Sequence, residues 1–128
     1  RFWASEEALV HPGLQRAAIA ASGDDTVQTR VTDIARGRQW PDAYKIRVVR
    51  NEFTDRWHGR DDELRAVAGS EGPLFQAALA AGDARIATPI VGEAAGLIRD
   101  VEPAAAILQR MTADAETRLG AGARFLSA

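Results

Sequence analysis

RNEFTDRWHGRDDELR, from Arg50 to Arg65, carries the signals for two consecutive helices. Asn51 is a residue type that caps helices, and Phe53 and Trp57 lie four positions apart, on one face of the helix that follows. Gly59 is typical of a helix end, and the acidic run DDE after it is typical of the next helix start. The alternating charges favour a solvated helix face over a substrate-binding cluster. The stretch therefore predicts two short helices, at about residues 52–58 and 61–68.

Three further helices are predicted on either side of this stretch. Ser5, followed by two acidic residues, has helix-start chemistry, and Pro12 interrupts the helix that it begins. Asp100 is the predicted N-cap of the last helix, and Gly120 is the residue expected just after its end. A turn is expected at residues 70–73. These helices are predicted at about residues 5–21, 74–81 and 101–119.

Two short strands complete the predicted regular structure. Thr26–Ile34 is rich in β-branched residues, and Tyr44–Val49 alternates apolar and basic residues. The segment at residues 86–90 is apolar but too short to classify, and Pro89 argues against a central strand there. With no internal repeat, residues 1–128 are predicted to form a single segment that is mainly α with a small β element.

The composition limits the classes of protein to which the chain can belong. At 128 residues, with 46% hydrophobic and 27% charged residues, it is expected to build one core and no membrane span. The net charge of -2 alone says nothing about nucleic acid, but basic and acidic residues alternate along the chain instead of forming a basic stripe, which argues against a nucleic-acid partner. The lack of cysteine excludes disulfides and thiolate sites and is typical of a cytoplasmic protein. A start at Arg1, without a signal peptide or initiator Met, indicates a processed or excised piece.

Gly92-Glu93-Ala94-Ala95-Gly96 is the strongest candidate for a ligand contact. Glycines allow close backbone approach, and free N–H groups at a helix start receive anions. The same G-x-x-x-G spacing also serves close helix packing, so both interpretations stay open. His11 and His58 are far apart, which argues against a histidine metal site, and each is more typical of a loop or a helix end than of a catalytic base.

Several segments, taken in their order along the chain, resemble the C-terminal portion of nitronate monooxygenases, also called 2-nitropropane dioxygenases. They are Arg1–Ala8 followed by His11-Pro12, then Asp25-Thr26-Val27, Arg50–Trp57 and Val91–Ile98. The last is also similar to an A-G-Q-x-x-G-L-I segment shared with flavin-dependent enoyl reductases. The resemblance covers the chain from Arg1 to about Leu119.

The resemblance implies an FMN enzyme on a (β/α)8 TIM barrel that oxidises alkyl nitronates with O2. This chain would be a C-terminal segment that lacks most barrel strands, supplying outer helices and one wall of the flavin site. It would be inactive alone. Its expected partner is the N-terminal part of the same protein, which carries the barrel, and a homo-oligomer is a further expectation.

The resemblance also implies which residues meet the cofactor. Arg1, Phe2, Gly92 and Glu93 are the expected FMN contacts, whereas the family's catalytic histidine lies upstream, so no catalytic residue is assigned here. Glu93 stands where many relatives have Gln, and a carboxylate beside a flavin phosphate is unfavourable unless a cation or a water intervenes. The alternative hypothesis is a non-enzymatic helical module that self-associates or binds a partner through an exposed apolar surface.

Overall fold

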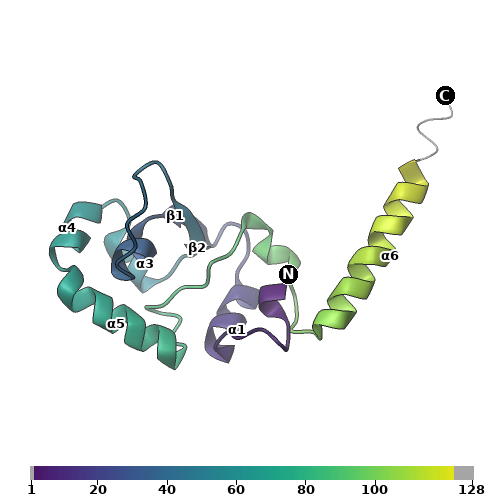
Figure 1. Cartoon of the computed structure of the whole chain (residues 1–128), viewed down its shortest axis with the longest axis horizontal. Coiled ribbons are helices and arrows are strands. Elements are labelled where there is room, and N and C mark those ends of the chain that lie inside the picture. Colours follow the sequence, from purple (N-terminus) through teal and green to yellow (C-terminus); the bar gives the residue numbers. More distant parts are fainter. Residues whose placement is uncertain (1, 123–128) are drawn as a thin grey trace. The chain divides into compact units, whose positions relative to one another are not determined.

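The computed structural model describes residues 2–122, and the chain divides into two compact units, Val10–Arg99 and Arg1–Leu9 with Asp100–Ala128. The first unit contains α1 (Pro12–Ala20), β1 (Thr26–Thr29), α2 (Val31–Ala35), β2 (Ile46–Val49), α3 (Glu52–Trp57), α4 (Asp61–Ala66), α5 (Ala68–Ala81) and the 3-10 helix η2 (Glu93–Leu97) (Figure 1). The second contains the 3-10 helix η1 (Phe2–Ala4) and α6 (Ala104–Gly122). None of the helices in the described part combines the length and apolarity needed to cross a bilayer.

The two predicted strands form an antiparallel pair. Its register runs from Thr26 opposite Val49 to Thr29 opposite Ile46, and Val48 in β2 is fully buried. On the other side of β2, Ile90 forms an isolated antiparallel bridge with Val48.

The backbone bonds beside this bridge explain how a proline is accommodated in it. The N–H of Val49 donates to the carbonyl oxygen of Pro89 at 3.1 Å, and the N–H of Val91 donates to that of Arg47 at 3.2 Å. Pro89 only accepts, so its missing N–H removes no bond of this ladder. The segment that leads to Gly92 is thereby tied to β2.

Asn51 caps α3 as predicted and also binds a distant part of the chain. Its side-chain oxygen accepts from the N–H of Thr54 at 2.9 Å, and the hydroxyl of Thr54 accepts from the N–H of Asn51 at 2.8 Å, which is a capping box. Its amide nitrogen donates to the carbonyl oxygens of Ala84 and Ile86, at 3.0 and 3.1 Å. One side chain thus joins the start of α3 to the segment after α5.

The core of the larger unit lies between α2, α3, α4 and α5. The rings of Phe53 and Phe75 pack with their centroids 5.2 Å apart, and Val31, Leu64 and Phe75 are fully buried. Trp57 is also buried, as predicted from its place on the same helix face as Phe53, and the guanidinium groups of Arg56 and Arg60 lie over its ring. Burying each of these large apolar side chains contributes roughly 1.5–3 kcal/mol.

Two segments of this unit differ from the sequence prediction. Residues 70–73 were expected to form a turn but lie within α5, with Pro73 inside the helix. Burial of Phe75 and Ala78 on one face of α5 outweighs the backbone bond that Pro73 removes. The first predicted strand ends at Thr29, because Val31–Ala35 forms α2 and buries side chains at helical spacing.

Two helix starts, at Ser5 and at about residue 101, were also predicted in the wrong places. Ser5 begins no helix: it forms a parallel bridge with Glu102, and α1 starts at Pro12 instead. His11 caps α1, since its Nδ1 accepts from the N–H of Gly13 at 3.1 Å. A local hydroxyl before acidic residues was thus a weaker signal than pairing with a distant segment.

The start of α6 shows the same effect of distant residues. Asp100 does not cap it. The helix starts at Ala104, whose N–H donates to Oε2 of Glu7 at 2.8 Å, and this hydrogen bond lowers the pKa of Glu7. Gly120, the predicted residue after the helix end, lies inside it. A cap from 97 positions away has no signature in the local sequence.

Replacing Asn51 tests its double role. Asn51→Ala removes the cap and leaves two carbonyl groups without their donor, so we expect it to lose about 2–3 kcal/mol of unfolding free energy. Asn51→Asp keeps the capping oxygen but cannot donate, and should lose roughly half as much. Urea denaturation of the full chain measures both, with the exposed Glu52→Ala as control. A loss below about 0.5 kcal/mol for Asn51→Ala would contradict the assigned role.

Candidate functional site

The predicted ligand segment adopts an open turn followed by a short helix. Gly92 has extended backbone, with φ -91° and ψ 175°, and η2 begins at the next residue. A Cβ atom built on Gly92 would have no neighbour nearer than the backbone nitrogen of Ala94, at 4.0 Å. The Gly92 backbone is therefore open to close approach by a ligand.

The other face of this segment packs tightly against the turn before β1. A Cβ atom on Gly23 would lie only 2.7 Å from the backbone oxygen of Glu93, and one on Gly96 would lie 3.4 Å from Cα of Ser22. Any side chain at Gly23 would push η2 away. Gly96 thus packs against a turn rather than against another helix, whereas Gly92 leaves its backbone exposed. The ligand contact at Gly92 stays a prediction.

The turn against which η2 packs is held by its own side chains. The N–H and the hydroxyl of Ser22 both donate to Oδ2 of Asp25, each at 2.8 Å. These two bonds, the backbone one first, lower the pKa of Asp25. The hydroxyl of Thr26 donates to the carbonyl oxygen of Gly23 at 2.7 Å. These bonds hold Gly23 in place, and because it has no side chain the backbone of η2 packs directly against it.

Arg47 is the residue that sequence reasoning missed at this site. Its Nη2 lies 2.8 Å from Oε1 of Glu93, and its Nη1 donates to the hydroxyl of Thr26 at 3.0 Å. Arg47 thus supplies the cation that a carboxylate at position 93 needs beside an anionic ligand. The alternation of apolar and basic residues in β2 was the available signal, because it places Arg47 on the opposite face from the buried Val48.

The four predicted cofactor contacts fall into different parts of the chain. Arg1 lies outside the described residues. Phe2 belongs to η1 in the smaller unit and is half exposed, whereas Gly92 and Glu93 belong to the larger unit. Only Gly92 and Glu93 are grouped into one site, together with Arg47.

The two histidines have the structural roles that the sequence favours. His11 caps α1, and its ring occupies the space that a side chain at position 82 would need. His58 is exposed at the end of α3, and its backbone N–H donates to the carbonyl oxygen of Thr54. Within residues 2–122 no group of histidine and acidic side chains is arranged to hold a metal ion.

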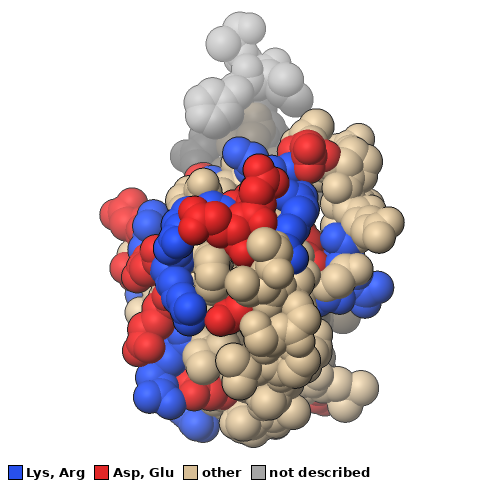
Figure 2. Space-filling view, turned by 90° about the vertical axis from the view of Figure 1, so that its left-hand side faces the viewer, with Lys and Arg blue, Asp and Glu red and all other residues tan. Residues whose placement is uncertain are grey.

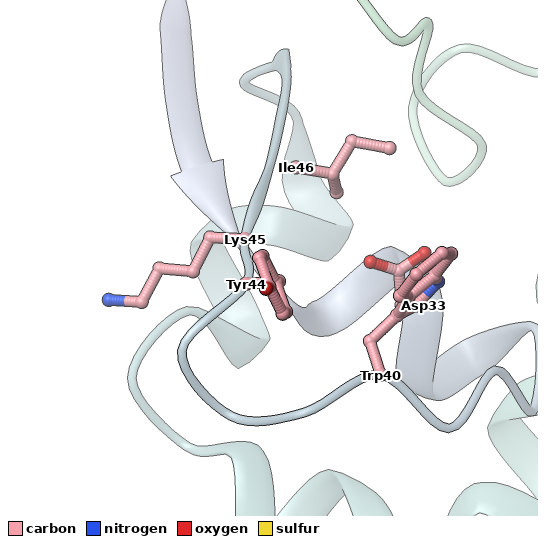
Figure 3. A pocket seen from close by; sticks show the side chains of 5 residues that line it. All are labelled: Asp33, Trp40, Tyr44, Lys45 and Ile46. Atoms are coloured by element: carbon pink, nitrogen blue, oxygen red, sulfur yellow. The ribbon is translucent and has the colours of Figure 1, made fainter.

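A second feature, which the sequence did not indicate, is a cavity of about 250 Å³ beside the loop between α2 and β2. It is lined by Asp33, Trp40, Tyr44, Lys45 and Ile46. In Figure 3 the Tyr44 and Trp40 rings stand on two sides of the space below Ile46, and the Lys45 ammonium extends away from it. Burial raises the pKa of the Asp33 carboxyl, an effect that the charges of Arg36 and Arg38 oppose.

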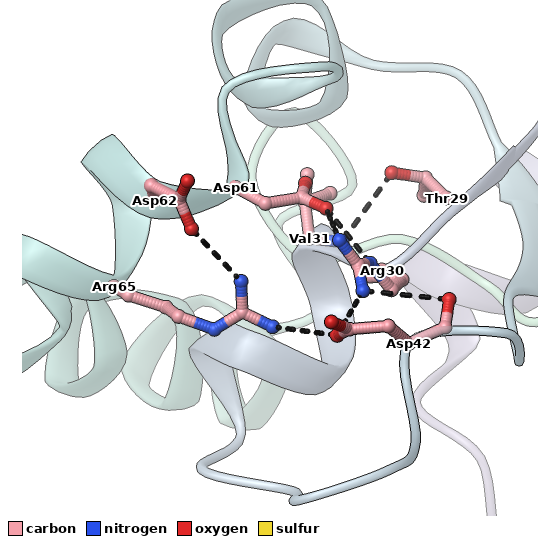
Figure 4. Close-up of polar contacts among 7 residues, drawn as sticks. All are labelled: Thr29, Arg30, Val31, Asp42, Asp61, Asp62 and Arg65. Carbon is pink, nitrogen blue, oxygen red and sulfur yellow. Dashed lines mark hydrogen bonds and ion pairs between the residues drawn. The ribbon is translucent and has the colours of Figure 1, made fainter.

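A network of ion pairs anchors the loop that carries these rings. Arg30 donates to Oδ2 of Asp61 at 2.8 Å through Nε and also pairs with the carboxylate of Asp42 (Figure 4). Arg65 lies 3.5 Å from Asp42 and 3.4 Å from Asp62. On the face drawn in Figure 2, basic and acidic side chains lie next to one another at the left and the top, beside a broad uncharged area at the lower centre. Asp42 thereby ties the loop to α4.

Comparison with known proteins gives a structural match only. No family model and no curated protein matches the sequence. FabK from Thermotoga maritima superimposes with a TM-score of 0.66 and 28% identity over 94% of this chain and 37% of that one. A point mutant of FabK from the same organism gives a TM-score of 0.68 and 26% identity over 98% and 35%.

The fold matches a segment of a TIM-barrel protein. The predicted fold class, mainly helical with two short strands, is confirmed. The chain spans little more than a third of the length of FabK.

The raised pKa of Asp33 leads to a pH-dependent stability. A carboxyl whose pKa is higher in the folded state costs stability once it ionises, so this cost appears as pH rises above the unfolded value of about 4. We expect Asp33→Asn to raise the melting temperature at pH 7 and to leave it unchanged near pH 3.

The control for this prediction is Asp24→Asn, which alters an exposed carboxyl in the same unit. Thermal unfolding at both pH values, followed by circular dichroism, is the measurement. An Asp33→Asn variant that is less stable than the native chain at pH 7 would show that the ionised carboxylate is stabilising, against this prediction.

Proposed function

We propose that this chain is the C-terminal part of an FMN-dependent nitronate monooxygenase built on a TIM barrel. The observation that carries the proposal is the match of nearly the whole chain to about a third of FabK. This match supports the coarser assignment, part of an FMN-dependent TIM-barrel oxidoreductase. The choice of nitronates as substrates rests on the order of the family-like segments along the sequence.

The residues at η2 fit one edge of an FMN site. The Gly92 backbone is open to a ligand, and Arg47 offers a cation whose charge is partly balanced by Glu93. In this proposal the Gly92 backbone and Arg47 bind the phosphate end of FMN, while Glu93 and Thr26 orient the Arg47 guanidinium. FMN, when bound, supplies the electron transfer, and the substrate pocket belongs to the remainder of the protein.

The remainder of the parent protein is the proposed partner of this chain. A TIM barrel places its active site at the C-terminal ends of all eight strands, so a segment without most of them cannot enclose a cofactor. We therefore propose that the N-terminal part of the same protein carries the barrel and that the isolated chain is inactive.

The intact protein that contains this chain tests the function. It should carry flavin, with an absorbance band near about 450 nm, and should consume O2 when an alkyl nitronate is added. Arg47→Ala should weaken FMN binding at least about tenfold because a phosphate contact is lost, whereas the exposed Arg16→Ala should not.

Two results would separate the parts of this proposal. An intact, folded protein that binds no flavin under any loading condition would refute the FMN assignment. A flavin-containing protein that does not oxidise nitronates but reduces an enoyl thioester would support the flavin assignment and refute the nitronate substrate.

A second candidate function, a helical interaction module, is favoured by the surface of α6. Leu108, Met111 and Leu119 are exposed by 57%, 41% and 78%, while Ile107 is the buried apolar residue of this helix in the described part of the chain. Exposed apolar side chains along one helix are typical of a surface that meets another chain or domain. The same surface would contact the barrel in the first proposal.

Light scattering of the isolated chain tests the interaction module. An isolated chain that acts as a self-associating module should be dimeric or larger, and the double substitution Leu108→Ser with Leu119→Ser should make it monomeric. The exposed Thr112→Ser on the same helix is the control. A chain that is monomeric at all concentrations and binds no other protein would count against the module.

A further inference from the structure

The cavity beside Trp40 has no part in the proposed flavin site. Ile46 lines the cavity and Arg47 pairs with Glu93, and successive side chains of a strand point to opposite faces. The cavity and the η2 site therefore lie on opposite faces of β2. A ligand in one would not compete for the side chains of the other.

The cavity is flanked by two aromatic rings that are unusually exposed. Trp40 is 61% and Tyr44 is 64% exposed, although the loop between them is anchored by the Asp42 ion pairs. Large aromatic side chains on an anchored loop leave apolar area in contact with water and offer flat faces for stacking. These rings could hold a planar group between or against them.

Two arginines line a hollow that adjoins this cavity. An adjoining hollow of about 470 Å³ shares Asp33, Trp40 and Ile46 with it and is also lined by Arg36 and Arg38. Most arginines in the described part of the chain are held in salt bridges, but Arg36 and Arg38 are in none there. Their charges act on the nearby Asp33 carboxyl, but no salt bridge holds either guanidinium group, so both can also meet an anion next to Trp40.

We propose that this cavity is a ligand site for a planar ring that bears an anionic group, as a mononucleotide does. The ring stacks on Trp40 beside Tyr44, and the phosphate meets Arg36 and Arg38. The Asp33 carboxylate, on the Trp40 side of the cavity, accepts N–H groups from the edge of the ring. The two adjoining hollows together have the size usual for small-molecule sites.

Titration of the full chain with AMP, followed by calorimetry and by tryptophan fluorescence, tests the proposal. AMP should bind saturably, with Trp40→Ala and the double variant Arg36→Ala with Arg38→Ala each weakening binding at least about tenfold. Trp40→Phe keeps a stacking face and should stay within about threefold of the native chain. Arg16→Ala, an exposed cation on α1, should bind AMP as the native chain does.

Adenosine and inorganic phosphate separate the two parts of the ligand. Each alone should bind at least about tenfold more weakly than AMP, because each makes half of the contacts. Equal binding of AMP and phosphate would overturn the ring contact, and equal binding of AMP and adenosine would overturn the anion contact. No saturable binding of AMP in the millimolar range, with circular dichroism showing a folded chain, would overturn the site itself.

Discussion

The larger unit depends on the side chain of Asn51, which joins segments that the chain order keeps apart. Its oxygen caps α3 and its amide nitrogen holds the carbonyl groups of Ala84 and Ile86. A serine or aspartate would cap the helix equally well but could not make both of the other bonds. Because α3 brings Phe53 onto Phe75, the same residue couples the segment after α5 to the core.

The link between α3 and the segment after α5 also positions the proposed flavin-binding residues Arg47, Gly92 and Glu93. From Ile86 the chain runs along β2, where Val49 and Val91 make the two backbone bonds that lead to Gly92. The two faces of β2 contribute to two different sites. On one face Arg47 pairs with Glu93, and on the other Ile46 lines the Trp40 cavity. The flavin edge and the proposed nucleotide site are thus set by one strand and can be lost or kept independently.

The sequence predicted the features that are encoded locally and missed those that arise from distant contacts. The Asn51 cap and the Gly59 helix end follow from residue type and spacing alone. The start of α6 was predicted in the wrong place because Glu7, a distant residue, accepts the hydrogen bond at the helix start. Residues 70–73 are helical because α5 buries Phe75 in the core. The Trp40 cavity was not predictable, since its loop is positioned by pairs between distant residues, such as Asp42 with Arg65.

Native-state hydrogen exchange of the full chain tests most directly whether Asn51 unites α3, β2 and the segment before Gly92. The amides of Val49, Phe53 and Val91, which donate to Pro89, Arg85 and Arg47, should exchange with similar opening free energies in the native chain. In Asn51→Ala all three should lose protection together. Loss of protection at Phe53 alone, with Val49 and Val91 unchanged, would contradict this account.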